Sequence, residues 1–306
     1  MKKLFIFTAV LATALTLVSC NKEKSTKPIE YEAPAYTEIA VKFEIEKNTL
    51  NDNLNLVKKY SSFEITETGD FIIVEKSGTK TGKVTNIEDI KDKAIDAPKT
   101  FECDGFGLVE LEKITKAEGN LRLVFKPKGE SPITLTAAPV ETSDSINKKF
   151  LKKIIRKWKI TDTTISVSGG DLPEALGVAK NFKGCDFAKI KEYVEDKSGK
   201  KVNMGDINKY KVDYLQVTGA GTFIVVFTNG ESVAADLELN TKDENTATLE
   251  YEVSGEQTGK AIFNGKANGE IRFDENGNCE MEVNANVDVN NDAYKGKVVF
   301  LVSKID

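Results

Sequence analysis

Residues 279–289 read CEMEVNANVDV, in which apolar residues alternate strictly with polar ones. Successive side chains of a β-strand point to opposite faces of its sheet, so this pattern predicts a strand with one buried face and one face in water. Similar short segments fill residues 211–303 and are separated by turn dipeptides such as Asn229-Gly230 and Asn276-Gly277. The sequence therefore predicts an antiparallel meander, with strands near 211–218, 221–228, 231–238, 246–253, 257–264, 268–274, 278–289 and 296–303.

The edges of such a meander expose unpaired backbone groups unless the sheet closes on itself. An up-and-down barrel within residues 145–306 is therefore the first architecture that the sequence predicts. An open sheet curled over helices is the second. The fold class predicted for the whole chain is mainly β.

A helix is predicted immediately before the meander. Phe150, Leu151, Ile154, Ile155 and Trp158 recur at helical spacing, and lysines occupy the opposite side. We interpret this segment as a basic amphipathic helix that closes one end of the barrel and leads into its first strand. A helix lying on anionic lipid is the alternative.

A strand and a helical insert should follow this helix. The strand runs from Trp158 to Ser168 and is ended by two glycines. Asp171 can cap a short helix, and Asp186 can cap a second one that ends near Gly199.

This order of elements, with Arg156-Lys157-Trp158-Lys159-Ile160 at the start of the first strand, resembles the lipocalin-like domains of small Bacteroidetes lipoproteins. The resemblance covers residues 145–306, and it implies a lipocalin-like β-barrel in this half. Arg156 stands where lipocalins carry a glycine two residues before the tryptophan.

The N-terminal half, residues 35–140, repeats part of the pattern. Aligning 65–78 with 217–230 matches six of fourteen residues, including the Thr-x-x-Gly-x-Phe-Ile core. We predict a duplicated strand-turn-strand unit, and hence a smaller related β unit in this half. Further strands are expected near 38–46, 106–112, 119–126 and 132–137, followed by a linker at 137–144.

Three segments are apolar at consecutive positions instead of alternating: 71–74, 223–227 and 298–302. A strand of this kind is buried on both faces. We therefore expect the two halves, or their helices, to pack over these strands.

The N-terminus has the features of an export signal. Residues 1–19 combine two lysines with an apolar run too short to span a membrane. Leu17-Val18-Ser19-Cys20 resembles the lipobox of bacterial lipoproteins, which implies lipidation of Cys20 and membrane attachment through that lipid. Residues 20–34 are then a polar tether, and loss of Lys2 and Lys3 takes the formal charge from -5 to -7.

The tether also bears on location. Lipoproteins of the kind that this chain resembles usually mark surface export by acids directly after the cysteine, whereas here Glu23 stands alone between lysines. The predicted location is the outer membrane, with its periplasmic face favoured over the cell surface.

The composition restricts the chemistry. The chain contains no histidine, which excludes Ser-His-Asp and Cys-His catalysis and imidazole metal sites. Arginine occurs three times and the charge is acidic, so nucleic acid is not an expected partner. No catalytic set, cofactor or metal site is predicted, and Cys103, Cys185 and Cys279 are assigned structural roles with at most one disulfide.

The favoured function is a non-catalytic module that binds a small apolar or amphipathic ligand, with Trp158, Phe223, Phe227 and Phe300 as candidate contacts. The alternative is a structural or protein-interaction lipoprotein of an envelope assembly, in which side chains fill the barrel. A carboxylate glycosidase is a third class. The acidic stripe of Glu280, Glu282 and Asp288 is interpreted as solvation, with a basic partner as the alternative.

Overall fold

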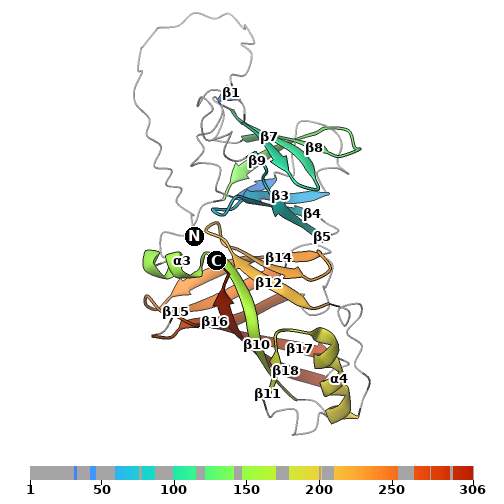
Figure 1. The fold of residues 1–306 in the computed structure, drawn as a ribbon, viewed down its shortest axis with the longest axis vertical. Coiled ribbons are helices and arrows are strands. Elements are labelled where there is room, and N and C mark those ends of the chain that lie inside the picture. Colours follow the sequence, from blue (N-terminus) through green and yellow to red (C-terminus); the bar gives the residue numbers. More distant parts are fainter. Residues whose placement is uncertain are drawn as a thin grey trace, which may run out of the picture.

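The fold is a pair of antiparallel β-barrels stacked along the long axis of the molecule, with two helices beside the second barrel (Figure 1). This arrangement is seen in a computed structural model. It describes residues 31–32, 42–45, 59–75, 78–86, 99–114, 121–140, 147–169, 179–199, 201, 210–253, 265–275, 277–289 and 292–305.

The C-terminal barrel is closed and has eight strands. Each strand pairs antiparallel with the next, and β10 pairs with both β12 and β18, which closes the circuit. The strands are β10 (Arg156–Gly169), β12 (Val212–Val217), β13 (Thr222–Phe227), β14 (Ser232–Thr241), β15 (Thr246–Val253), β16 (Gly265–Phe273), β17 (Cys279–Val289) and β18 (Asp292–Lys304). The predicted barrel is confirmed, although the expected strand at 257–264 lies outside the described residues and β10 supplies the eighth strand.

Helix α3 (Lys148–Ile154) closes one end of this barrel, as the sequence predicted. Asn147 caps its first turn, and Phe150 and Ile154 are completely buried in the barrel core. The helix ends earlier than expected, because Arg156 already pairs with Val217 of β12. Trp158 therefore belongs to β10, and its indole Nε1 donates to the carbonyl of Ile154 at 3.0 Å.

Helix α4 (Phe187–Ser198) packs beside β10 and β11 (Lys180–Lys183), at the pole away from the N-terminal barrel (Figure 1). Its predicted limits are confirmed: Asp186 caps its N-terminus, and Gly199 ends it in the left-handed conformation with φ 66°. The short helix expected after Asp171 lies outside the described residues.

The N-terminal barrel repeats the circuit of the C-terminal one. Strand β2 pairs with both β3 and β9, and β3 to β9 follow one another. The strands are β2 (Lys42–Ile45), β3 (Tyr60–Ile65), β4 (Asp70–Glu75), β5 (Gly78–Lys83), β6 (Lys99–Cys103), β7 (Gly107–Ile114), β8 (Leu121–Pro127) and β9 (Ile133–Pro139), with β1 (Tyr31–Glu32) beside β7.

The seam between β5 and β6 is the weak point of this circuit. It contains one bridge, between Val84 and Cys103, and the side chain of Asn86 extends it. The Asn86 amide donates to the Thr100 carbonyl and accepts from the Glu102 amide, both at 2.9 Å. Two predictions need correction here. Strand β6 was not expected, and residues 137–139, expected in a linker, belong to β9 because they pair with β2.

The predicted strand-turn-strand repeat has equivalent geometry in the two barrels. The Thr66 amide donates to the Asp70 carbonyl at 2.8 Å, and the Thr218 amide donates to the Thr222 carbonyl at 3.0 Å. Gly69 and Gly221 occupy the same place in these turns, with φ 72° and 76°. Both hairpins also carry an irregularity at the equivalent position of β3 and β12. The sequence match therefore corresponds to a structural equivalence, which supports duplication.

The two barrels meet through the outer faces of these hairpins. Ile72 and Val74 of β4 pack against Ile224 and Val226 of β13, with Ala234 of β14, and all five are buried. The inner faces of the same strands belong to the separate barrel cores. Double burial is thus confirmed for 71–74 and 223–227. It is wrong for 298–302, because Leu301 faces outward and is 41% exposed.

Polar contacts surround this apolar centre. Strand β5 lies beside β14 at the interface (Figure 1). Thr79 of β5 pairs there with Ser232 of β14, and the Ser232 hydroxyl donates to the Thr79 carbonyl at 3.1 Å. Lys157 binds the Asp70 carboxylate at 3.1 Å. The Lys42 ammonium forms an ion pair with Asp236 of the other barrel.

We expect Ile224→Ala to lower the free energy of unfolding by about 2–5 kcal/mol, because it opens a cavity between the barrels. Leu301→Ala is the matched control and should change it by less than about 0.5 kcal/mol, since its side chain is exposed. Urea unfolding followed by circular dichroism measures both values. Equal effects of the two substitutions would contradict the double burial.

Candidate functional site

The interior of the C-terminal barrel is the first place to look for a ligand site. It contains a cavity of about 10 Å³, about the space of one water molecule. Its wall is entirely apolar except for one tyrosine. The lining residues are Phe223, Leu237, Leu249, Tyr251, Ile271, Met281, Val283 and Phe300.

Two of the four predicted contact residues line this cavity, namely Phe223 and Phe300. Trp158 lies at the end that α3 closes, where its ring packs against Phe273 with centroids 5.9 Å apart. Phe227 lies toward α4, with its ring centroid 4.7 Å from that of Tyr210. The structure therefore divides the predicted set between the cavity, the α3 end and the α4 side.

Six lining residues were not singled out from the sequence. They occupy inward positions of β14 to β17. Strand alternation identified Met281 and Val283 as core, but it gave no reason to separate them from other core residues, and the other four were placed only within expected strands. Tyr251 is the polar member of the wall, and burial raises the pKa of its hydroxyl to about 12. It stays neutral at physiological pH.

Aromatic side chains also pack against one another inside the N-terminal barrel. Phe125 contacts Tyr60, Phe63 and Phe106 edge to face, with ring centroids 5.0–5.9 Å apart. All four rings are almost completely buried. Edge-to-face packing at this spacing is a favourable arrangement of aromatic side chains.

The three remaining cysteines are buried free thiols. Burial raises the pKa of Cys103 and Cys185 to about 12, and burial also raises that of Cys279. A thiolate is the reactive form of cysteine, so these groups are inert at neutral pH.

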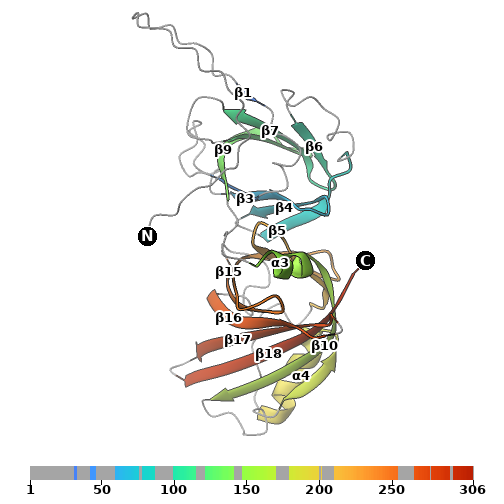
Figure 2. The same ribbon diagram turned by 90° about the vertical axis from the view of Figure 1, so that its left-hand side faces the viewer.

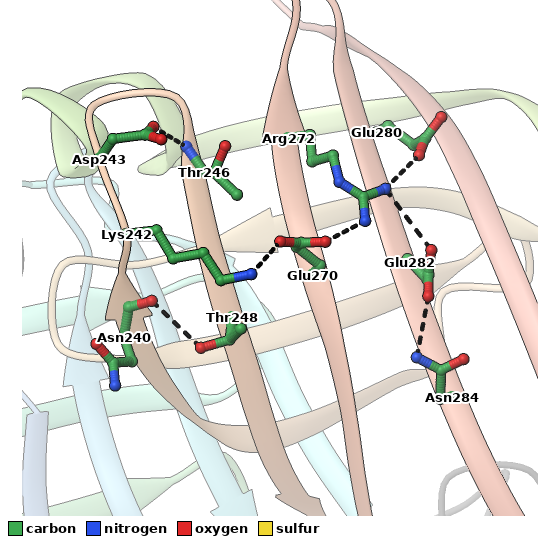
Figure 3. A network of polar contacts seen from close by, with 10 residues as sticks. All are labelled: Asn240, Lys242, Asp243, Thr246, Thr248, Glu270, Arg272, Glu280, Glu282 and Asn284. Carbon is green, nitrogen blue, oxygen red and sulfur yellow. Dashed lines mark hydrogen bonds and ion pairs between the residues drawn. The ribbon is translucent and has the colours of Figure 1, made fainter.

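A network of charged side chains covers the outer face of β16 and β17 (Figure 3). Arg272 lies at its centre, bound to Glu270, to Glu280 at 3.0 Å and to Glu282 at 3.7 Å. Lys242 binds Glu270 at 2.6 Å, and Lys297 binds Glu282 at 2.8 Å.

The acidic stripe expected on β17 is therefore neutralised within the chain at Glu280 and Glu282. The hydrogen bond from Lys242 lowers the pKa of Glu270, and the hydrogen bond from Lys297 lowers that of Glu282. The Asp288 side chain lies outside the described residues. Sequence alternation identified the wet face of this strand but not the cations on the neighbouring strands.

Within the described part of the chain, no group of three or more Cys, Asp or Glu side chains is arranged to hold a metal ion. The helices of that part are too short or too polar to cross a membrane.

Comparison with known proteins gives a distant structural likeness. No protein-family model and no curated protein matches the sequence. A candidate outer membrane protein of Bacteroides fragilis NCTC 9343 is 12% identical, with a TM-score of 0.27, and the match covers 88% of this chain and 100% of that one. A variant of the vaccine antigen Transferrin Binding Protein B from Haemophilus parasuis Hp5 is 11% identical, with a TM-score of 0.23. That match covers 80% of this chain and 53% of the Haemophilus chain, so this chain spans about half of that protein. Likeness at this level gives no information on function.

We expect Arg272→Gln to raise the pKa of Glu270 and, more weakly, that of Glu282, which keeps its ion pair with Lys297. Carboxyl NMR titration measures both values. The stabilisation that these carboxylates provide is present at neutral pH and is lost as the pH falls through their lowered pKa values.

The matched control is Arg122→Gln, which removes the equivalent cross-strand pair with Glu112 on the N-terminal barrel. It should leave the titration of Glu270 unchanged. An unaltered Glu270 titration in Arg272→Gln would show that Arg272 has no part in the network.

Proposed function

We propose that this protein is a non-catalytic lipoprotein of the outer membrane, anchored through Cys20, which binds a protein partner through the outer surfaces of its barrels. The observation that carries the proposal is the filled interior of the C-terminal barrel. Ligand pockets usually occupy about 300–1,000 Å³, whereas the cavity here measures about 10 Å³. Recognition is therefore assigned to the outside of the molecule.

The position of β1 supports an orientation on the membrane. Tyr31 pairs with Ile114 of β7, at the pole of the N-terminal barrel that points away from the C-terminal barrel (Figures 1 and 2). Residues 20–31 span at most about 40 Å when fully extended. An anchor on Cys20 would hold the N-terminal barrel near the membrane and leave the C-terminal barrel exposed to partners. The tether was expected to cover residues 20–34, but Tyr31 and Glu32 pair with β7, so we assign it to residues 20–30. We favour the periplasmic face.

A small apolar ligand is the second candidate. The apolar wall around Phe223 and Phe300 favours it, because Met281 in that wall is flexible and can repack around a guest. This function requires the cavity to enlarge on binding.

Native mass spectrometry separates the two candidates. The mature protein, with Cys20 replaced by serine, is incubated with a lipid and metabolite extract of its own envelope. A filled barrel predicts the mass of the protein alone. An adduct that disappears in Phe223→Trp, which fills the cavity, would overturn the proposal and identify the second candidate as correct.

Membrane attachment and partner binding are tested in intact cells. A photo-crosslinking amino acid replaces the exposed Leu301, and we expect one discrete crosslinked protein and recovery of the chain in the membrane fraction.

The lipid anchor is tested by fractionation of the same cells. Cys20→Ser should release the chain into the soluble fraction, whereas the control Asn21→Ser should not. Persistence of Cys20→Ser in the membrane would contradict the anchor, and crosslinking that does not depend on ultraviolet exposure or position would contradict a specific partner.

A further inference from the structure

One carboxyl group is enclosed between the two barrels. Glu64 lies on the outer face of β3 and is 2% exposed. Its Oε2 atom is 2.6 Å from the Thr222 hydroxyl, which belongs to the C-terminal barrel and donates to it. The Thr218 hydroxyl of the same turn is a second hydrogen-bond partner.

Among the described residues, Lys42 is the cation whose charge acts on Glu64, and it belongs to the same barrel as Glu64. Lys42 is its cross-strand neighbour on β2, but the Lys42 ammonium is bound to Asp236 of β14. Glu67, in the adjacent turn, accepts a hydrogen bond from the Gly219 amide at 3.1 Å and adds a negative charge nearby. The carboxyl therefore has hydroxyl partners from the opposite barrel, and its nearest ammonium is committed to another acid.

The position equivalent to Glu64 in the C-terminal barrel is occupied by a neutral side chain, Gln216. Glu64 pairs with Lys42, and Gln216 pairs with Lys157 at the matching point of β12 and β10. Gln216 is also buried, with 4% of its surface exposed. A neutral amide of almost the same shape thus occupies one of the two equivalent sites, and an acid occupies the other.

We propose that docking of the two barrels is linked to a proton on Glu64, so that the barrels hold each other more tightly when this carboxyl is neutral. In a separated barrel the outer face of β3 would be in water, where a charged carboxylate is well solvated. Docking removes that water without supplying a cation. A neutral carboxyl loses far less on transfer, because desolvation penalises the charged form.

The direction of the pH effect follows. Burial raises the pKa of Glu64 in the docked state and outweighs the hydrogen bonds from Thr218 and Thr222 and the attraction of Lys42, which lower it. Docking is therefore strengthened at pH values below this raised pKa and weakened as the pH rises through it. Linkage of one proton changes the docking constant by up to about tenfold per pH unit.

Protonation of a second interface acid, Asp70, weakens docking at low pH. Burial alone would raise its pKa, but the Thr68 hydrogen bond and the ion pairs with Lys83 and Lys157 outweigh burial and lower it. Since Lys157 belongs to the C-terminal barrel, protonation of Asp70 at low pH removes an inter-barrel ion pair. Docking is thus tightest in a mildly acidic window, between the lowered pKa of Asp70 and the raised pKa of Glu64.

The test measures docking directly in the full mature chain. Spin labels are placed on cysteines at the exposed positions Lys128 and Glu275, one on each barrel, with Cys20 replaced by serine. Ile224→Ala is included in all samples, because it weakens the interface and brings the docking equilibrium into a measurable range. Electron–electron resonance then gives the fraction of docked molecules between about pH 2 and 9, a range that extends below the ordinary pKa of an aspartate, where the effect of Asp70 is expected.

With Glu64 present, we expect the docked fraction to fall as the pH rises through the raised pKa of Glu64. Glu64→Gln should abolish this fall, while the loss of docking at low pH, here called the acid limb, should remain. Glu67→Gln is the matched control, since it removes the other interface acid and should keep the alkaline fall. Asp70→Asn should abolish the acid limb alone, which tests the second half of the window. Superimposable profiles for Glu64 and Glu64→Gln, or docking that tightens with rising pH, would overturn the proposal. Circular dichroism at each pH confirms that both barrels stay folded.

Discussion

Strands β4 and β13 are buried on both faces, and the assembly of the molecule depends on this double burial. Their inward side chains, such as Phe71 and Val225, complete the separate cores of the two barrels. Their outward side chains, Ile72 and Ile224 among them, have no water to face and pack against each other. At about 25 cal/mol for each Å² of apolar surface removed from water, a second buried face makes separation of the barrels costly. The stacked arrangement is the way in which this sequence buries both faces at once.

The interface also has an approximate two-fold character, because equivalent residues of the two barrels meet across it. Thr79 pairs with Ser232, and these residues occupy matching positions opposite Val74 and Val226. Glu67 contacts Gly219, its equivalent in the second hairpin. A surface that binds its own counterpart in this way is the isologous contact of a symmetric dimer. The two hairpins thus pack as the halves of a symmetric dimer would, although the charged residues around them diverge.

That divergence is visible in the ion pairs. Lys42 and Lys157 are equivalent, and each reaches an aspartate of the opposite barrel. The acceptors come from different strands: Asp236 is in β14, whereas Asp70 is in β4. Each barrel thus contributes one lysine and one aspartate, although not at matching positions. The interior of the C-terminal barrel differs from this interface. It is apolar, it is closed by α3 at one end, and its described side chains leave space for about one water molecule around Phe223 and Phe300.

The sequence by itself determined the elements and the class of the fold. Alternation along 279–289, the caps Asp186 and Gly199, and the turn repeated at Gly69 and Gly221 are local signals, and local backbone chemistry is enough to interpret them. The sequence also predicted three strands covered on both faces, and this is correct for β4 and β13 but wrong for β18. Only the tertiary structure decided what covers them, which of four predicted aromatic residues share a cavity, and which cations neutralise the acids of β17. Strand β6 and the exposed face around Leu301 belong to the same group. These features depend on which segments far apart in the chain become neighbours, and that is set by closure of the barrels and by their packing, not by the spacing of residues along one strand.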